Sequence, residues 1–480
     1  MINTKRNNAE LPPGVANTDL SRVAASNAGQ SVRIDNPHMQ ERSDVRRLIA
    51  ENLQGFCDSV IVEPNNWEVP ADRPLNLTPT ESKKSPASRA IIGAFRPNLY
   101  LHARPNETDK AKAYPGIEPA QRLYQMCVDS GKALFGVRHL LPDYASGMAV
   151  MQNAILTFSN SDDIVLSVSP KRGGHELTRK NAELFSRRSV FMDCDLRTGE
   201  FDLVKVEREL DGAQPAMIYV DATNSLVPYD LTALRRAFPD ACIIFDGSQV
   251  LGLIAGNAYP NPLEEGADVL VGSTHKTLYG PIQGVAMTND EALHNALQAT
   301  LNITQSNNNL ANLAALTCVF EEYHDFGAEF ARRLIDNANK LGRVLAQRRW
   351  SVVLPDATSD DSLRTQHVWA APSAEMTKDE IRSLQKTLEA SGITTLAVSL
   401  ELEPGCEKTY LRLGTLELTQ RGAGLEHMWK IALALEVGAR YGSDRAQGFV
   451  DEIKKTCNHM QFCFSPADIE NFGFIRVLSA

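Results

Sequence analysis

The chain lacks long hydrophobic runs, an apolar leader and an excess of positive charge. In its 480 residues no apolar run reaches the roughly 18 residues that a membrane-spanning helix needs. The first twenty residues have no apolar core of the kind found in secretory signal peptides. Lys and Arg number 49 against 59 Asp and Glu, a formal net charge of −10, whereas nucleic-acid binding needs clustered cations. We therefore expect a soluble, cytoplasmic protein with no membrane or nucleic-acid partner.

Cysteine is also scarce, and no metal-binding pattern is present. Of the eight cysteines, Cys242 and Cys318 lie in apolar segments, and only Cys457 and Cys463 are close in sequence. No His or Cys pair flanks them at the spacing of a zinc site, and the ten histidines include no HExxH motif. We expect free thiols in a reducing compartment and no metal site.

What the chain does contain is an alternation of helical and strand patterns. Residues 1–110 are polar or broken by prolines, and we expect an N-terminal extension and wrapping segment there. Residues 111–340 alternate helical stretches with short apolar runs, which predicts a large domain with a mostly parallel sheet flanked by helices. The expected strands are 163–169, 188–193, 216–222, 242–248 and 268–273.

A second, smaller domain is expected at residues 341–480. A long helical pattern covers 310–350, with an expected interruption near Gly327. After it, strand-like runs at 351–357, 366–372 and 409–415 mix with helical runs at 376–392 and 424–442. This mixture predicts a small α+β domain with a C-terminal tail.

The strongest chemical signal is Lys276, directly after the expected strand 268–273. A lysine at the carboxyl end of a buried strand can be oriented and partly desolvated, as Schiff-base chemistry requires. Taken alone, it would more commonly be an exposed loop residue. Asp246 ends another expected strand about thirty residues earlier, although alone it could cap a turn. Because ligands bind beyond the carboxyl ends of such strands, the pair matches a pyridoxal-phosphate site. There the lysine holds the aldehyde carbon and the carboxylate pairs with the pyridine nitrogen.

Two glycine-containing segments are candidates for the rest of that site. Ser146, Gly147 and Met148 stand at the start of a helical stretch, and a helix N-terminus favours a phosphate, although any helix cap can look this way. Gly173 and Gly174 precede His175, whose imidazole could stack on a cofactor ring or simply be packed.

Five segments, in this order, resemble motifs of serine hydroxymethyltransferase, a fold type I pyridoxal-phosphate enzyme. They are LTPTESKKSP (77–86), GGHELT (173–178), FDGSQVLGLIAG (245–256), THKTLYGP (274–281) and YLRLGTLELTQRG (410–422). The similarity runs from about residue 75 to residue 440. It implies an α/β fold of type I, pyridoxal 5′-phosphate as cofactor, and a homodimer with active sites at the interface.

The resemblance also implies residue roles. Lys276 would form the aldimine, Asp246 would pair with the pyridine nitrogen and His175 would stack on the ring. The other cofactor-binding residues that it implies are Ser146, Gly147, Met148, Thr223, Gln249, Ser273 and His275. Arg412 would hold the substrate's α-carboxylate bidentately, and the resemblance places Thr80, Tyr100 and Tyr114 at the same substrate site.

Departures from the family pattern fall mainly on its folate side. His102 stands where the family has a catalytic Glu, and Gln249 where it has a His. Glu176 replaces a Leu that contacts folate, and Ile282 replaces an Arg. The segment 303–310 has no glycine where the family has a glycine-rich loop. The cofactor half of the pattern is kept but the folate half largely is not, so folate binding is doubtful.

These observations predict a pyridoxal-phosphate-dependent transferase or lyase acting on an amino acid. We expect folate-independent cleavage or formation of the Cα–Cβ bond of a β-hydroxy amino acid through a Lys276 aldimine and a glycine quinonoid. That activity is of the threonine aldolase, transaldolase or hydroxymethyltransferase-like kind. His102 could move the β-hydroxyl proton, since imidazole titrates near neutral pH, or could merely fill the space left by Glu.

The alternatives are other chemistry at Cα in a specialised pathway, namely decarboxylation, oxidative deamination or transamination, and a folate-dependent hydroxymethyltransferase. A non-catalytic homologue is disfavoured, because Lys276, Asp246, His175 and Arg412 are all retained.

Overall fold

The computed structural model describes residues 74–94, 117–355 and 364–464. The chain divides into two compact units, 1–61 and 62–480, and every described residue belongs to the second. Tyr100, His102 and Tyr114 lie outside the described residues. The expected boundaries 1–110, 111–340 and 341–480 stay predictions.

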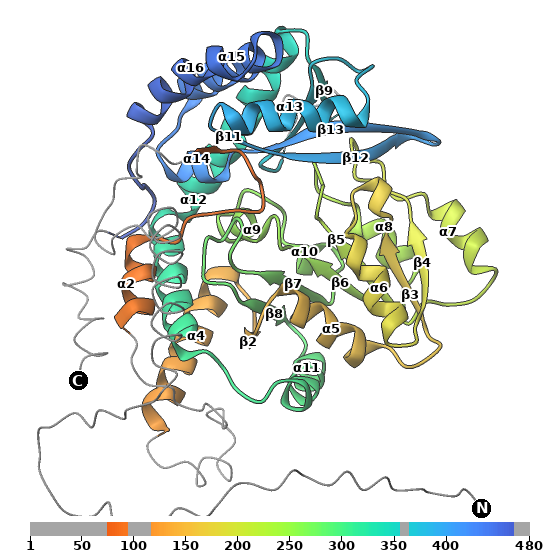
Figure 1. Ribbon diagram of the computed structural model, residues 1–480. Helices are drawn as coiled ribbons and strands as arrows, with labels where there is room; N and C mark the ends of the chain where they lie inside the picture. Colours follow the sequence, from red (N-terminus) through yellow and green to blue (C-terminus); the bar gives the residue numbers. More distant parts are fainter. Residues whose placement is uncertain (1–73, 95–116, 356–363, 465–480) are drawn as a thin grey trace, which may run out of the picture. The chain divides into compact units, whose positions relative to one another are not determined.

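A seven-stranded sheet forms the centre of the described part (Figure 1), in the order β2-β8-β7-β6-β5-β3-β4. Strands β3 to β7 run parallel, whereas β8 is antiparallel to both of its neighbours. This confirms the predicted mostly parallel sheet. The strands are β2 (His139–Tyr144), β3 (Ile164–Val168), β4 (Arg188–Met192), β5 (Met217–Asp221), β6 (Cys242–Asp246), β7 (Val269–Ser273) and β8 (Gly284–Thr288).

Helices cover both faces of this sheet, as a buried parallel sheet requires. Successive strand residues point to opposite faces: Ile243 and Phe245 join the apolar cluster with α4, α7, α8, α9 and α12, while Ile244 joins the one with α5, α6 and α11. The helices are α4 (Glu118–Phe135), α5 (Gly147–Phe158), α6 (Glu176–Leu184), α7 (Leu203–Leu210), α8 (Leu231–Ala237), α9 (Leu251–Ala255), α10 (Pro262–Glu265), α11 (Glu291–Thr304) and α12 (Leu310–Gln347), with the short 3₁₀ helix η2 (Pro170–Arg172). Of the helices in the described ranges, none is both long and apolar enough to cross a bilayer.

A second, four-stranded antiparallel sheet has the order β12-β13-β10-β9. Its apolar residues share a core with those of the helices packed against it, including the C-terminal part of α12. The strands are β9 (Ser351–Val353), β10 (His367–Ala371), β12 (Leu396–Glu403) and β13 (Cys406–Gly414); the helices are α13 (Lys378–Ala390), α14 (Leu416–Gln420), α15 (Leu425–Tyr441) and α16 (Ser443–Thr456).

The expected break of the long helix near Gly327 is wrong, because α12 is continuous from Leu310 to Gln347. Glycine lowers helix stability by up to ~1 kcal/mol relative to alanine, but here backbones pack closely around it. A Cβ on Gly256, at the end of α9, would overlap the carbonyl oxygen of Gly327. Tertiary packing thus outweighs the local propensity.

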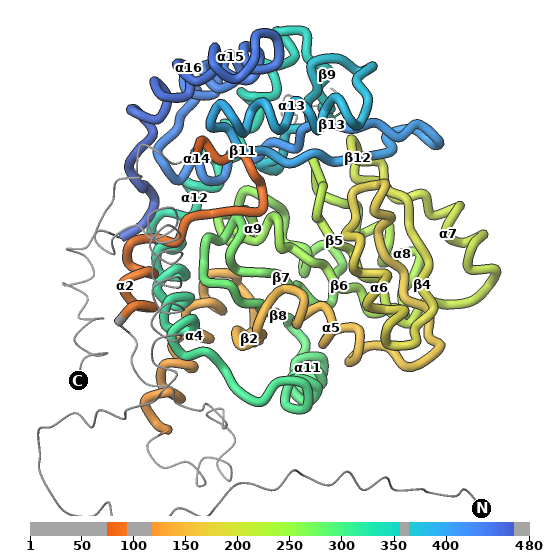
Figure 2. The backbone as a smooth tube through the Cα atoms, in the orientation of Figure 1, coloured from red at the N-terminus to blue at the C-terminus, as the bar shows by residue number. Residues whose placement is uncertain are grey.

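Residues 74–94 form an N-terminal strap that contacts β11 (Ile393–Thr394), the end of β13 and the long helix α12. Its strand β1 (Leu75–Asn76) pairs in parallel with β11, and the N–H of Gly414 donates to the carbonyl of Leu77 (2.7 Å). The strap then leads to α2 (Pro86–Ala94), which packs along α12 (Figure 2).

Candidate active site

Lys276 lies three residues beyond the end of β7, in a loop held from several sides. The Oγ1 of Thr274 donates to the carbonyl of Pro281 (2.5 Å), and Tyr323 donates its hydroxyl to the carbonyl of Thr277. The strap contributes Ser82, whose Oγ donates to the carbonyl of His275 (2.6 Å). The loop is therefore fixed by α12 and by the strap as well as by its own strand.

Burial lowers the pKa of Lys276, and the positive charge of Arg412 lowers it further, while Asp246 and Asp221 oppose the shift. A lowered pKa increases the share of neutral amine, which is the nucleophilic form needed to attack an aldehyde. The electrostatic setting thus suits the predicted covalent role.

Asp246 ends the neighbouring strand β6, as expected from its sequence position. One carboxylate oxygen accepts the hydroxyl of Tyr219 (2.8 Å), and the other accepts the N–H of Ser248 (2.9 Å). Only 7% of Asp246 is exposed. A carboxylate fixed in this way can face a cationic ring nitrogen without reorienting.

Asp221 ends β5 directly opposite Asp246 in the parallel register, and it is also buried. Burial, and then the neighbouring Asp246, raise the pKa of Asp221 to about 8, against hydrogen bonds from the His175 backbone and from the Thr178 and Thr223 side chains. Two carboxyl groups therefore lie side by side, and Asp221 holds a proton near neutral pH.

His175 is the N-cap of α6 and lies next to this pair. Its Nδ1 accepts the N–H of Leu177 (3.3 Å). Burial lowers the pKa of His175, Asp246 acts in the opposite sense, and Lys276 and Arg412 lower it again. The imidazole is therefore neutral at physiological pH, as stacking on a cationic ring requires.

Arg412 reaches the same cluster from β13 of the small sheet. Its Nη2 donates to the carbonyl of Thr223 (2.5 Å) and lies 3.2 Å from Nε2 of His367. Burial lowers the pKa of Arg412 to about 9, so the guanidinium is still charged at pH 7. Its Nε is buried and has no hydrogen-bond partner among the described residues.

The predicted phosphate segment lies at the N-terminus of α5. Ser146 caps this helix, because its Oγ accepts the N–H of Ala149 (3.1 Å), and Sδ of Met148 accepts from Asn181 (3.3 Å). A Cβ on Gly147 would come within 2.9 Å of Cβ of Ser273. The absence of a side chain at Gly147 therefore lets the helix N-terminus approach the end of the lysine strand.

The residues present fit pyridoxal phosphate. Beside the lysine and the N-terminus of α5, the buried Oγ of Ser273 and Nδ1 of His275 have no hydrogen-bond partner in the described structure. The same holds for both amide atoms of Gln249, three residues after Asp246. Unpartnered buried polar atoms are costly, so their presence next to a helix N-terminus, a lysine and a carboxylate points to a polar, anionic ligand.

Thr80 lies in the strap, near the arginine. The preceding Pro79 accepts a hydrogen bond from Gln366 through its carbonyl (2.9 Å) and lies against Gly414, two residues after Arg412. No described contact involves the Thr80 side chain itself. Its substrate-binding role, like those of Tyr100, His102 and Tyr114, stays a prediction.

Sequence reasoning missed three residues of the cluster: Tyr219, Asp221 and His367. Asp221 carried a usable signal, because it ends an expected strand just as Asp246 does. His367 and Tyr219 carried none, since an isolated His or Tyr in an apolar strand is ordinarily part of the core.

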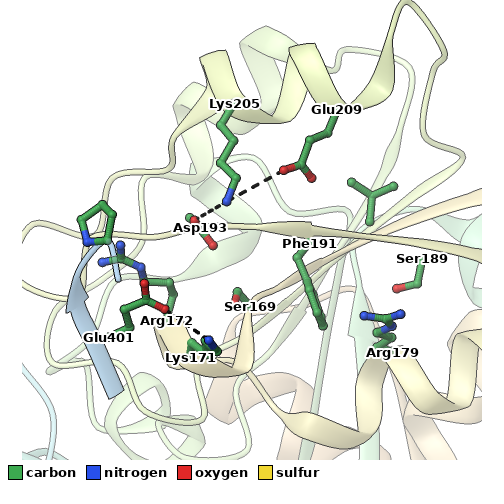
Figure 3. A pocket seen from close by; sticks show the side chains of 12 residues that line it. Ser169, Lys171, Arg172, Arg179, Ser189, Phe191, Asp193, Lys205, Glu209 and Glu401 are labelled. Carbon is green, nitrogen blue, oxygen red and sulfur yellow. Dashed lines mark hydrogen bonds and ion pairs between the residues drawn. The ribbon is translucent and has the colours of Figure 1, made fainter. Parts of the chain in front are cut away.

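A surface pocket of about 610 Å³ lies elsewhere, beside the edge strand β4 (Figure 3). Four of its charged side chains form two pairs: Nζ of Lys205 lies 2.6 Å from Asp193, and Nζ of Lys171 lies 3.7 Å from Glu401. In the sheet order, β3, β5 and β6 separate β4 from the lysine strand β7. This pocket is therefore separate from the lysine cluster.

Comparison with known proteins agrees with this geometry. Residues 68–435 match the family model described as serine hydroxymethyltransferase. Fluorothreonine transaldolase from Streptantibioticus cattleyicolor is 33% identical over 292 residues, which is 58% of this chain but only 45% of that protein. L-threonine:uridine-5′-aldehyde transaldolase from a Streptomyces species is 29% identical over 75% of this chain and 84% of its own length. Serine hydroxymethyltransferase from Methanosphaera stadtmanae is 26% identical over 77% and 86%, respectively.

Among solved structures, L-threonine transaldolase from Pseudomonas fluorescens in its internal aldimine state superposes with a TM-score of 0.76. The match covers 91% of this chain and 98% of that one at 20% identity, and so establishes the fold. The fold is that of the fold type I pyridoxal-phosphate enzymes. The chain belongs to the serine hydroxymethyltransferase family.

Proposed function

We propose that the protein is a pyridoxal-phosphate-dependent, folate-independent L-threonine transaldolase. It would cleave the Cα–Cβ bond of a β-hydroxy amino acid and join the remaining glycyl unit to a second aldehyde. The observation that carries this proposal is the buried cluster of Lys276, Asp246, His175 and Arg412, drawn from both sheets. The two transaldolase relatives support the choice of reaction.

In this proposal the cofactor is held by residues around the carboxyl ends of β5, β6 and β7. Its phosphate would bind at the N-terminus of α5 with the hydroxyl of Ser273, and its ring nitrogen would face Asp246. When bound, pyridoxal phosphate supplies an aldehyde for amine addition and a protonated ring that accepts electrons from the bonds to the substrate's Cα. Thr223 and Gln249 would complete the polar surroundings.

Arg412 would fix the amino acid through its carboxylate, which sets the bond to be broken. The Cα–Cβ bond of threonine breaks, the β-hydroxyl gives its proton to a base, and Cβ leaves as acetaldehyde. In the reverse direction, Cα bonds to the carbonyl carbon of the acceptor aldehyde and the new hydroxyl takes a proton. His102 is the candidate base of our sequence analysis and lies outside the described residues.

Two surface features support independence from folate. Glu176, directly after His175, is exposed and pairs with Lys180 (2.8 Å), so a charge stands where the pteridine needs apolar contact. Ile282 is 58% exposed and offers no cation where the family has an arginine. We further propose that the protein is cytoplasmic and works as a homodimer, with Tyr100 and Tyr114 near the partner's site.

The test is acetaldehyde release from L-threonine by the purified, cofactor-loaded enzyme without folate, with and without an aromatic aldehyde. Acetaldehyde release, and a new β-hydroxy amino acid when the aldehyde is present, are the expected results. Lys276→Ala serves as the control and should abolish both, because the nucleophilic amine is removed. A folded, cofactor-loaded enzyme that releases no acetaldehyde in either condition would overturn the proposal. In that case decarboxylation and amino-group transfer would be assayed with other amino acids.

A further inference from the structure

The small sheet and the loop after β5 meet at Arg412, and His367 lies where they meet. We propose that His367 is a positioning residue that holds the guanidinium of Arg412 in its carboxylate-binding orientation. This inference rests on the proposed function, in which Arg412 binds the substrate's carboxylate.

The sheet register places the two side chains on one face. In the antiparallel pair β10–β13, His367 lies opposite Gly414 and Trp369 lies opposite Arg412. Residues two apart on a strand share a face, so His367 and Arg412 are diagonal neighbours, a separation that long side chains bridge. The 3.2 Å contact between Nη2 of Arg412 and Nε2 of His367 is the result.

The partners of His367 determine which ring nitrogen carries the proton. Nδ1 lies 3.2 Å from the carbonyl oxygen of Ser225, and a carbonyl only accepts, so Nδ1 carries the hydrogen. Nε2 is then the acceptor for Arg412. The Oγ1 of Thr365 donates to the same carbonyl (2.9 Å), which keeps that oxygen in place.

This tautomer makes His367 a neutral acceptor rather than a competing cation. His367 is fully buried. Its burial and the charge of Arg412 both lower its pKa well below the usual value, so it is uncharged at physiological pH. Nη2 of Arg412 thus has two fixed acceptors. They are Nε2 of His367, from the four-stranded sheet, and the carbonyl of Thr223, from the loop after β5.

With Nη2 engaged in this way, the plane of the guanidinium is set before any substrate arrives. The buried Nε–H is left without a partner in the described part of the chain, and so it is available to a carboxylate oxygen. A pre-oriented guanidinium loses less freedom on binding, which improves affinity without adding a contact. His367 therefore acts on the substrate through Arg412 and need not touch it.

Two substitutions distinguish the contribution of Nε2 of His367 from that of Nδ1. The amide of His367→Gln reaches about as far as Nε2 and keeps an acceptor for Arg412. His367→Asn is shorter, keeps only the contact to Ser225, and leaves Arg412 without this acceptor. The dissociation constant of L-threonine is measured from the absorbance change of the bound cofactor. The dissociation constant of L-threoninol, which lacks the carboxylate, is measured in the same way for comparison.

We expect His367→Asn to weaken L-threonine binding about tenfold, as is typical for the loss of a hydrogen bond to a charged group. The affinity for L-threoninol and the affinity for the cofactor should stay unchanged. His367→Gln should bind L-threonine nearly as the wild type does. In turnover, the effect of His367→Asn should fall on KM rather than on kcat.

Arg412→Lys distinguishes the failure of this inference from failure of the proposed function. If Arg412→Lys weakens L-threonine but His367→Asn does not, the inference is wrong while the carboxylate clamp stands. If Arg412→Lys leaves L-threonine binding unchanged, the clamp itself is wrong. Should His367→Asn not fold, His367→Met, which fills the space without a nitrogen acceptor, replaces it with the same expectation.

Discussion

Asp221 and Asp246 are buried side by side at the ends of adjacent strands, and two carboxylates this close cannot both ionise without cost. Burial and Asp246 raise the pKa of Asp221 to about 8, so it is protonated at pH 7. Asp221→Asn should therefore keep most of the activity at pH 7, because an amide resembles the neutral acid. Asp246→Asn should lose at least ~100-fold, because a positioned charge at the reacting centre is removed.

The pH profile gives the sharper test of this pair. As pH rises through about 8, Asp221 ionises and adds a negative charge beside Lys276, which raises the amine's pKa. The wild type should show this change in kcat/KM and in cofactor absorbance, and Asp221→Asn should lack it. Equal damage from Asp221→Asn and Asp246→Asn at pH 7 would contradict the assignment of the proton.

At the residue scale, the sequence predicted those site residues that lie at or just beyond the carboxyl end of a strand. Lys276 and Asp246 were predictable because the carboxyl ends of parallel strands meet at one edge of the sheet. His367 was not, since its role depends on its antiparallel register with Arg412 and on a carbonyl some 140 residues away, that of Ser225. Neither the strand register nor the distant hydrogen bond can be recognised from a local sequence pattern.

At the scale of elements, the short helix α9 holds the lysine loop through close backbone contact at Gly252. Its N–H donates to Oγ1 of Thr277 (3.1 Å), and a Cβ there would overlap the Thr277 carbonyl and the Tyr323 hydroxyl. Gly252→Ala should therefore displace the loop of Lys276, lower the unfolding midpoint by several degrees and weaken cofactor binding. Thermal unfolding and cofactor titration measure the two effects.

Gly448→Ala is the matched control, because no atom lies within 4 Å of the added Cβ, and the residue is inside helix α16. That change should stabilise the protein slightly through helix propensity. A cofactor affinity of Gly252→Ala equal to that of the control would show that α9 does not support the lysine loop.

The central strands β3 to β7 were predictable because each is a short apolar run bounded by turn residues. Strands β1, β2, β8, β11 and β12 were missed. The sequence of β8, GVAMT, is too short to separate from loop by periodicity, and β12 is only partly buried. The continuity of α12 through Gly327 depended on its packing against α9, which no local pattern reports.

At the scale of the whole described molecule, Glu322 links α12 to the segment that follows α16. Its carboxylate is fully buried and accepts the N–H of Phe464 (3.0 Å). Burial raises the pKa of Glu322 from 4.5 to about 8. The folded state thus binds this proton more tightly than the unfolded chain. The contribution of Glu322 to stability is therefore fully present below pH 4.5 and is lost as pH rises to about 8.

Glu322→Gln should remove that loss, because the amide keeps the acceptor and cannot ionise. At pH 8 its unfolding midpoint should exceed that of the wild type, and towards pH 5 the two should converge. Glu321→Gln, on the exposed side of the same helix turn, is the matched control, and its unfolding midpoint is measured over the same pH range. A pH-independent gap for Glu322→Gln would contradict the assignment.

The strap has a consequence for the order of events during synthesis. Leu75 pairs with Ile393, and the carbonyl of Leu77 accepts the N–H of Gly414. The strap therefore cannot make these contacts until residues more than 300 positions later in the chain have been synthesised. The central sheet can form while translation continues, since domains generally fold as units as they emerge. The hydrogen bond from Ser82 to the lysine loop is made by the same strap. The nascent chain therefore acquires its sheet first and a fully ordered lysine loop last.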